Sequence, residues 1–155
     1  MREHTLQAQH FIYPLFIHPG EGRQSIPSMP GMARLGTQAV LEEVEGTLKD
    51  GVSAVVLFPA LDESYKTPRG EESANPKGLV PETIRRLKDR WPELTVVTDV
   101  ALDPYSSDGH DGIVSEDGRI LNDETVEILC KQALCQAEAG ADIIAPSDMM
   151  DGRVG

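Results

Sequence analysis

The run Leu94-Thr-Val-Val-Thr-Asp-Val100 decides the fold, because it is short, almost continuously apolar and rich in β-branched residues. Runs of this kind are typical of strands that are buried on both faces of a parallel sheet. Similar runs occur at residues 11–17, 53–58 and 141–145, and helical patterns separate all four. The order β-α-β-α-β-α-β predicts an α/β fold, with right-handed crossovers and helices outside a parallel sheet.

The three segments between these runs carry apolar residues at helical spacing. Thr37 is predicted to cap the first helix, Pro81 lies in the first turn of the second, and Asn122 or Asp123 is predicted to cap the third. Gly140 supplies a left-handed residue that ends the third helix. The positions predicted to be buried are Val40, Leu41, Val44 and Leu48 in the first helix, Ile84, Leu87 and Trp91 in the second, and Val126, Leu129, Cys130, Ala133 and Ala137 in the third.

The loops between these elements differ in length. The strand-to-helix segments run from about residue 59 to 78 and from about residue 102 to 121, whereas helix-to-strand links such as residues 50–52 are short. In a barrel or an open parallel sheet, the strand-to-helix loops emerge at the carboxyl ends of the strands, where sites form. A functional site is therefore expected on the two long loops.

The composition narrows the class of protein. The chain of 155 residues is long enough for one domain, and its net charge of −12 argues against a nucleic-acid partner, because a phosphate backbone requires a basic face. No run approaches about 18 apolar residues, so neither a membrane span nor a membrane partner is expected. Cys130 and Cys135 form no CxxC pair and are predicted to pack in a reducing compartment. The expected location is the cytoplasm, or the chloroplast stroma if the protein is plastid-borne.

Four acids and one histidine follow the third strand closely: Asp99, Asp103, Asp108, His110 and Asp111. If the strand continues through Asp103, the side chains of Asp99 and Asp103 point to one face. Oxygen ligands without a thiolate favour Mg²⁺ over structural zinc. The alternative is that these acids are solvated turn residues, and the spacing of His110 assigns it no role.

An imine-forming lysine requires a desolvated pocket that lowers its pKa. The five lysines lie on helical patterns or in loops: Lys49, Lys66, Lys77, Lys88 and Lys131. None is predicted at a strand end inside the pocket. Lys66 and Arg69 could contact an anionic substrate at the rim, although a solvated loop is the competing interpretation.

Three segments closely resemble the porphobilinogen synthase family, also called 5-aminolevulinate dehydratases. They are Asp99-Val-Ala-Leu-Asp-Pro-Tyr105, Gly109-His-Asp-Gly112 and Ala145-Pro-Ser-Asp-Met-Met-Asp-Gly-Arg-Val154. Further similar segments, at residues 11–17, 27–31, 56–59 and 75–80, extend the resemblance over nearly the whole chain. The resemblance implies a TIM barrel, of which this chain covers about the first four βα units. Residues 1–155 are then the N-terminal part of one TIM-barrel domain, truncated before the later strands.

The resemblance also implies a function. The family is a group of lyases that condense and dehydrate two 5-aminolevulinate molecules to porphobilinogen, in the biosynthesis of haem and chlorophyll. It implies that Asp99 and Ser147 line the substrate pocket and that Asp99 supports catalysis. Zinc-type members have cysteines where this chain has Ala101, Asp103 and Asp111, so the chain resembles the aspartate-rich type of plants and cyanobacteria. The implied cofactor is Mg²⁺ at Asp103 and Asp111, with a monovalent cation as a further candidate and no organic cofactor.

The same resemblance limits what the isolated chain is expected to do. The imine-forming lysines of the family lie on later strands, so the 155-residue chain is expected to be inactive. The family forms homo-octamers, which are not expected of a chain with so short an N-terminal arm. Two alternatives share the same residues: a half-barrel that pairs with itself or with a separate C-terminal half, and a metal-binding module that has lost catalysis.

Overall fold

The computed structural model describes residues 3–155, which form a six-stranded sheet in the order β2-β3-β1-β4-β5-β6. β1, β4, β5 and β6 are parallel to one another, as the sequence predicted, and β2 is antiparallel to β3. The elements in chain order are η1 (Ala8–His10), β1 (Ile12–Ile17), β2 (Arg23–Ser25), β3 (Ala33–Leu35), α1 (Thr37–Lys49), β4 (Ala54–Pro59), η2 (Glu63–Tyr65), η3 (Glu71–Ala74), α2 (Leu79–Arg90), β5 (Thr95–Val100), α3 (Asn122–Glu138) and β6 (Ile143–Pro146).

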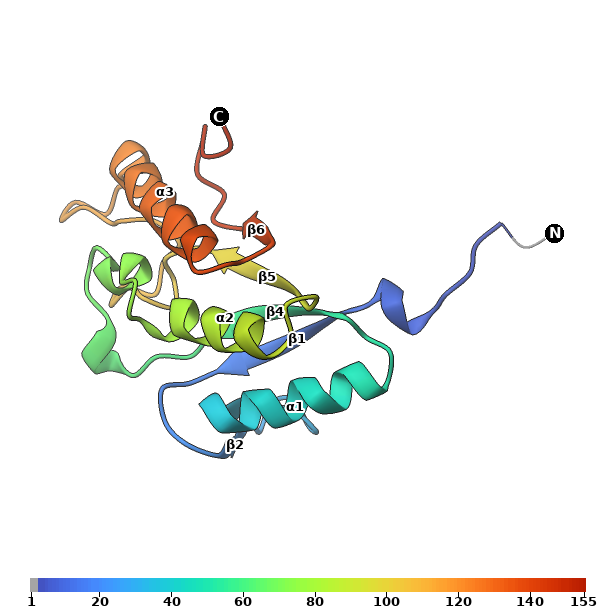
Figure 1. The fold of residues 1–155 in the computed structure, drawn as a ribbon. Helices are drawn as coiled ribbons and strands as arrows, with labels where there is room; N and C mark the ends of the chain where they lie inside the picture. The colour runs from blue at the N-terminus through green and yellow to red at the C-terminus, as the bar shows by residue number, and fades with distance from the viewer. Residues whose placement is uncertain (1–2) are drawn as a thin grey trace.

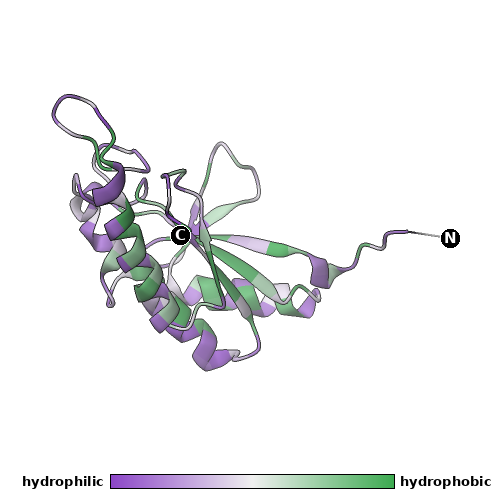
Figure 2. Ribbon diagram, turned by 90° about the horizontal axis from the view of Figure 1, so that it is seen from above, coloured by the Kyte–Doolittle hydropathy of each residue, from purple (hydrophilic) through white to green (hydrophobic). Residues whose placement is uncertain are grey.

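The three α-helices cover one face of the sheet, and in residues 3–155 no helix covers the other (Figures 1 and 2). The covered face holds the core, where Val55 and Val96 are fully buried. Side chains alternate along each strand, so the open face receives the residues in between. Ile12 and Ile143 remain 52% and 47% exposed. In a closed TIM barrel this face would be the barrel lining, which four βα units leave uncovered.

The helices form where the periodicity predicted them, but the predicted caps are wrong. Thr37 and Asn122 are the first helical residues of α1 and α3, Asp123 is the second residue of α3, and no side chain caps either helix. Asn122 instead binds the backbone of Asp151 through both its amide nitrogen and its amide oxygen. The end of α3 was predicted correctly, since Gly140 has a φ of 107°.

The buried face of α3 differs in part from the predicted one. Cys130 and Ala137 are exposed, whereas Cys135 is buried. The residues that α3 buries are Thr125, Ile128, Leu129, Gln132, Cys135 and Gln136. The buried stripe includes Gln132 and Gln136 in place of the predicted Cys130 and Ala137, because the glutamine amides donate to the backbone carbonyls of Ala101 and Asp99.

The β2–β3 hairpin was not predicted. β3 pairs in parallel with the carboxyl-terminal end of β1, where Phe16 lies opposite Arg34 and Ile17 opposite Leu35. All three residues of β2 are exposed, so the strand lacks the apolar run that marks a buried strand. The hairpin therefore extends the sheet beside the mouth of β1.

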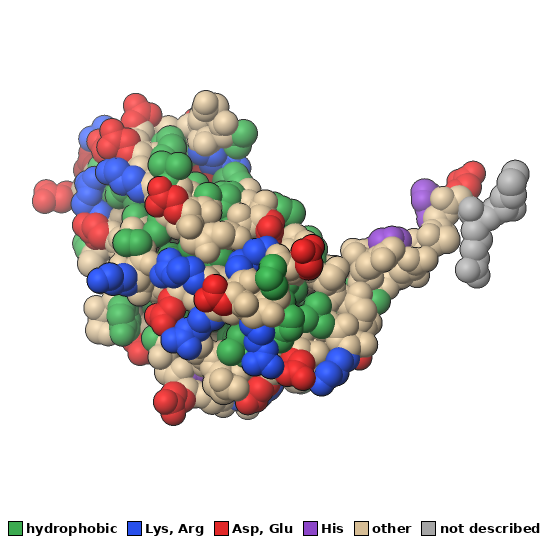
Figure 3. Space-filling view, viewed as in Figure 1, with side chains coloured by type: hydrophobic (Ala, Val, Ile, Leu, Met, Phe, Trp, Pro, Cys, Tyr) green, Lys and Arg blue, Asp and Glu red, His purple; other side chains and the backbone are tan. Residues whose placement is uncertain are grey.

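The surface over the helices carries acidic and basic side chains interspersed with apolar ones (Figure 3). Seven ion pairs among residues 3–155 lie on or between surface elements, such as Arg86 with Glu82 and Arg90 with Glu45. Within residues 3–155, no helix has the length and apolar character needed to cross a membrane.

Candidate active site

The two long strand-to-helix loops are joined at the carboxyl ends of β4 and β5. Thr67 forms a parallel bridge with Ser106. The backbone N–H of Thr67 donates to Tyr105 O over 3.1 Å, and the N–H of Ser107 donates to Thr67 O over 3.1 Å. The loops that were expected to carry function therefore form one connected unit.

Asp99 and Ser147 meet at the mouth of neighbouring strands. Asp99 is half-buried near the end of β5, and Ser147 directly follows β6. The Ser147 hydroxyl Oγ donates a hydrogen bond of 2.6 Å to Asp99 Oδ1. Burial raises the pKa of Asp99, and the negative charges of Asp111 and Asp148 raise it further, while the bond from Ser147 opposes them. Asp99 thus retains its proton to a higher pH than an ordinary aspartate.

Asp103 reaches this site by a different route from the predicted one. β5 ends at Val100, so the expected shared strand face of Asp99 and Asp103 is wrong. Asp103 lies in a turn, closed by the N–H of Tyr105 donating to Leu102 O over 2.8 Å. Proline after Asp103 favours a turn at this point over continued extended chain.

The turn nevertheless brings Asp103 next to Asp111. Burial raises the pKa of Asp103, and it is raised further by the charges of Asp111 and Asp99 and by a hydrogen bond shared with the Asp111 carboxyl. The carboxyl of Asp103 therefore interacts through its charge with both Asp111 and Asp99.

The carboxylates of this site are candidate ligands for a metal ion. Among residues 3–155, no group of three or more His, Cys, Asp or Glu side chains is arranged as a set of metal ligands. Mg²⁺ is usually held by only one or two carboxylates, with water completing its octahedral shell. The crowding that raises the pKa of Asp103 is a concentration of negative charge that a divalent ion would relieve. An ion held by Asp103 and Asp111 alone would need water for the rest of its shell.

Asp108 and His110 are residues of the same loop that bond within it. Both are exposed, and His110 Nδ1 accepts a 2.9 Å hydrogen bond from the N–H of Gly112. His110 is thus bound to its own loop. Gly112 lets the loop pack closely, because a Cβ there would lie 2.8 Å from Cγ2 of Ile120.

The loop after β6 is held by a buried acid. Asp148 is fully buried, and its Oδ1 accepts a 2.7 Å hydrogen bond from the N–H of Met150. Arg153 Nε lies 3.1 Å from Asp148 Oδ2, as an ion pair without the angle of a hydrogen bond. This pairing compensates the buried charge and fixes the segment that presents Ser147.

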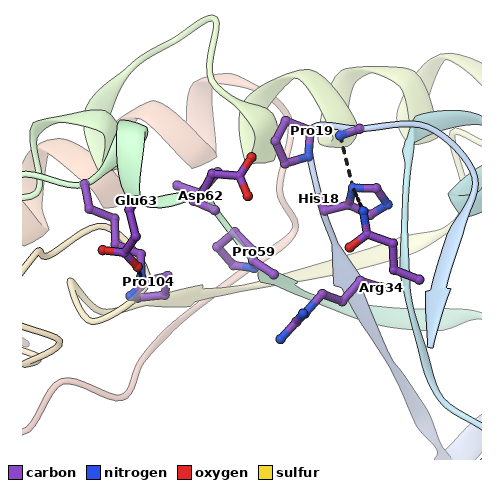
Figure 4. A pocket seen from close by; sticks show the side chains of 12 residues that line it. His18, Pro19, Arg34, Pro59, Asp62, Glu63 and Pro104 are labelled. Atoms are coloured by element: carbon purple, nitrogen blue, oxygen red, sulfur yellow. Dashed lines mark hydrogen bonds and ion pairs between the residues drawn. The ribbon is translucent and has the colours of Figure 1, made fainter. Parts of the chain in front are cut away.

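A cavity of about 420 Å³ lies at the carboxyl ends of β1 and β4, beside the carboxylates (Figure 4). Its polar lining includes His18, Arg34, Asp62, Glu63 and Lys66, and Pro104 connects it to the turn that carries Asp103. Lys66 Nζ forms an ion pair of 2.6 Å with Glu63 Oε1. The loop cation considered for an anionic substrate is therefore paired within its own loop.

The sequence reasoning missed two buried glutamines that contact the strand carrying Asp99. Gln132 and Gln136 are each 1% exposed, and their Nε2 atoms donate to backbone carbonyl oxygens of β5 and of the residue just beyond it. Glutamine is usually a surface residue, so its type alone gave no signal. The available signal was their spacing of one helical turn within the same stripe as Leu129.

A parallel sheet with helices outside and a polar site at its carboxyl ends defines an α/β enzyme of the TIM-barrel type, here in part. The sequence profile of the delta-aminolevulinic acid dehydratase family matches residues 1–155. The chain therefore belongs to the delta-aminolevulinic acid dehydratase family.

Individual relatives agree with this assignment. Chloroplastic delta-aminolevulinic acid dehydratases of Pisum sativum and Glycine max are 61% and 59% identical over 155 residues, which cover 99% of this chain and 39% and 38% of theirs. The crystal structure of delta-aminolevulinic acid dehydratase (porphobilinogen synthase) from Toxoplasma gondii, in complex with the reaction product porphobilinogen, matches with a TM-score of 0.97 at 51% identity. That match covers 99% of this chain and 44% of the other.

The chain thus spans less than half the length of these relatives. Its architecture corresponds to about four βα units of a TIM barrel, which confirms the predicted fold class. The family is metal-dependent.

Proposed function

We propose that this chain supplies the Asp99 and Ser147 wall of a porphobilinogen synthase active site, which condenses two 5-aminolevulinate molecules to porphobilinogen. The observation that carries the proposal is the 2.6 Å bond from Ser147 Oγ to Asp99 Oδ1 at the mouth of adjacent strands. It is supported by the 51% identity to a relative whose structure contains porphobilinogen.

The chemistry of Asp99 suits this reaction. Joining two amino ketones with loss of water requires protons to leave carbon and nitrogen and to reach the departing oxygen. Burial raises the pKa of Asp99, which brings the carboxyl nearer to the range in which a general acid or base works. Ser147 orients the carboxyl through one oxygen, so that Asp99 faces the substrate in a defined direction.

The lysines of this chain do not suit imine formation. Among residues 3–155, Lys49, Lys88 and Lys131 are on helices, and Lys77 is on the long loop after β4. Lys66 lines the cavity on that loop, but its ammonium is paired with Glu63. The resemblance implies that the imine-forming lysines belong to later strands. The isolated chain should therefore hold part of the substrate pocket without turning substrate over.

Asp103 and Asp111 are the residues proposed to hold a Mg²⁺ ion. When bound, the ion supplies positive charge that keeps neighbouring carboxylates ionised and stabilises negative charge on oxygen. In calorimetric titrations of the chain with Mg²⁺, Asp103→Ala or Asp111→Ala should weaken binding at least tenfold, roughly the worth of one lost ligand. The control Asp108→Ala should change it less. If none of the three variants changes Mg²⁺ binding, these acids are solvated turn residues and the proposed metal site is wrong.

Porphobilinogen formation from 5-aminolevulinate in the presence of Mg²⁺ tests the function directly. The 155-residue chain is assayed alone, and then mixed with the remaining C-terminal portion of the pea relative. Activity only in the mixture is expected, because the mixture supplies the missing strands. Activity of the chain alone contradicts the expected inactivity, and no activity in the mixture counts against the proposed function.

Location and assembly follow from the same proposal. The pea and soybean relatives are named chloroplastic, so the proposed location is the plastid stroma. The octamer implied by the resemblance stays a prediction, as does the identity of the ion. Size-exclusion chromatography with light scattering measures the assembly of the chain, alone and joined to the pea portion.

A further inference from the structure

Two glutamines on α3 hold the backbone of the strand that carries Asp99. Gln136 Nε2 donates to Asp99 O, and Gln132 Nε2 donates to Ala101 O, each over 3.2 Å. The two glutamines are four residues apart on the helix, a rise of about 6 Å, and their two acceptors are two residues apart along the strand direction, a rise of about 6.6 Å. Because the helix and the strand run in opposite directions, both hydrogen bonds can form at once. Both side chains are 1% exposed, which makes these contacts part of the interior.

The Asp99 carbonyl requires such a donor because of a neighbouring proline. In a parallel sheet, every second residue of a strand directs its backbone N–H and C=O toward the same neighbouring strand. Thr95 is such a residue of β5, because its N–H donates to Ser53 O, next to β4, over 3.0 Å. Continued along β5, this alternation directs the Asp99 carbonyl toward β4 at the level of Pro59. Proline has no N–H, so the ladder offers no donor at that level. Gln136 supplies the missing hydrogen bond.

Burying these two glutamines has a cost for the stability of the fold. The Oε1 atoms of Gln132 and Gln136 are buried, and neither has a hydrogen-bond partner within residues 3–155. An apolar side chain of similar volume would avoid burying an acceptor without a donor. Because the two buried glutamines lower stability in this way, we expect them to serve the geometry of a site.

We propose that Gln136, assisted by Gln132, is a positioning residue that fixes Asp99 for catalysis. Gln136 holds the main chain of Asp99 from the helix side, and Ser147 holds its side chain from the strand mouth. Neither glutamine touches the reacting atoms in this proposal. It rests on the proposed porphobilinogen synthase function, since its kinetic effect is expressed through the role of Asp99.

The test uses a full-length protein in which residues 1–155 are joined to the remaining residues of the pea relative. Gln136→Met keeps the volume and removes the donor. It should lower kcat about tenfold and leave KM within about twofold, because a small misplacement of a catalytic group acts on the reaction step. Gln136→Glu should regain part of its kcat as the pH falls, since only the protonated carboxyl donates a hydrogen bond.

Thr83→Val is the matched control. Thr83 is 3% exposed, and its hydroxyl donates to Leu79 O within α2, so the variant removes a buried polar group without touching β5. It should keep the parental kcat and KM. Thermal unfolding of every variant separates a lower kcat from a smaller folded fraction.

Crystal structures of the same proteins keep the two proposals apart. Gln136→Met should lengthen the Ser147 Oγ to Asp99 Oδ1 distance, and Thr83→Val should not. If the parent protein forms no porphobilinogen, the proposed function fails and this distance alone decides the positioning role. A Gln136→Met protein with the parental kcat and an unchanged distance overturns it. A kcat that falls only in proportion to the folded fraction overturns it as well.

Discussion

Ser147 Oγ donates to Asp99 Oδ1 over 2.6 Å, although 48 residues separate the two along the chain. The contact exists because β5 and β6 are adjacent parallel strands whose register places Asp99 opposite Ala145. Ser147 then lies just beyond the end of β6, at the mouth of the sheet. The pair joins a carboxyl of raised pKa to the group that orients it.

Removing the Ser147 hydroxyl should change both the rate and its pH dependence. The hydrogen bond stabilises the ionised form of Asp99, so Ser147→Ala should raise the Asp99 pKa further and move the acid limb of the activity profile to higher pH. In the full-length pea fusion, kcat/KM should fall about tenfold. Steady-state kinetics across pH measure both effects.

Ser107→Ala is the control for this variant, because Ser107 is an exposed serine of the same loop cluster, bound to Thr67 through its backbone N–H. It should leave the profile in place. An unmoved acid limb in Ser147→Ala would show that Asp99 is not the group that titrates.

Repulsion between Asp103 and its neighbours should make the unfolding free energy fall with rising pH. Burial and the charges of Asp111 and Asp99 raise the pKa of Asp103 above its ordinary 3.8, so the folded state binds that proton more tightly than the unfolded state. This contribution is fully present below pH 3.8 and is lost as the pH rises through the raised pKa. At pH 7 and without divalent ions, Asp103→Asn should therefore be more stable than the parent.

The expected gain is about 0.5 kcal/mol, a small value because Asp103 is only partly desolvated and keeps an exposed surface where solvent screens the repulsion. Urea unfolding at pH 7 and at pH 4 measures the gain and its decrease at the lower pH. Asp108→Asn, on the same loop, should show no comparable gain. A loss of stability in Asp103→Asn at pH 7 would mean that its charge is favourable in the fold.

Asp142 should contribute stability with the opposite pH dependence. Burial tends to raise its pKa, but the Val96 N–H at 2.8 Å and the Lys88 ammonium at 3.0 Å together lower it. The folded state then favours the ionised form, and the contribution is present above the ordinary pKa and lost as the pH falls through the lowered one. Asp142→Ala should cost about 1 kcal/mol at pH 7, since its side chain is 39% exposed and solvent screens the pair.

Lys88→Met separates the two contacts of Asp142, because it removes the charge and leaves the hydrogen bond from Val96. It should cost less than Asp142→Ala at pH 7. Guanidinium or urea unfolding at neutral and acidic pH provides the comparison. A constant penalty of Asp142→Ala at every pH would contradict the role of its charge.

Two glycine substitutions should have opposite effects on stability. Gly46 is exposed within α1, and a Cβ there would meet nothing within 4 Å, so Gly46→Ala should stabilise by roughly 0.5–1 kcal/mol through helix propensity. A Cβ on Gly112 would lie 2.8 Å from Ile120 and 3.0 Å from Met150, so Gly112→Ala should destabilise by about 1–3 kcal/mol. Denaturant midpoints measure both, and a stabilising Gly112→Ala would disprove the close packing.

Much of the architecture could be predicted from local patterns. The four apolar runs became parallel strands, and the long loops met at their carboxyl ends, because a doubly buried strand and its crossover leave a signal in contiguous residues. The β2–β3 hairpin left no such signal, since its residues 23–25 are polar and exposed. Helix caps also escaped prediction: Asn122 binds Asp151, a residue that approaches only in the folded chain.

The site was predictable to a similar degree. Asp103 and Asp111 were singled out as metal ligands and Asp99 as a pocket residue, and the charges of Asp111 and Asp99 do raise the pKa of Asp103. The predicted shared strand face of Asp99 and Asp103 was wrong, because β5 ends at Val100 and Asp103 lies in the turn that follows. The role of Gln136 could not be predicted from its residue type, because it depends on Pro59, a residue of another strand that lacks the N–H donor the Asp99 carbonyl would otherwise have.

Order along the chain therefore established the α/β class, the position of the functional loops and the family resemblance, since each depends on residues that are close in sequence. Only the tertiary structure decided that Ser147 binds Asp99, that Asp111 lies against Asp103 and that Gln136 replaces the donor missing at Pro59. These contacts depend on strand register and on helix-to-sheet packing. Both are set by the whole core rather than by any local segment.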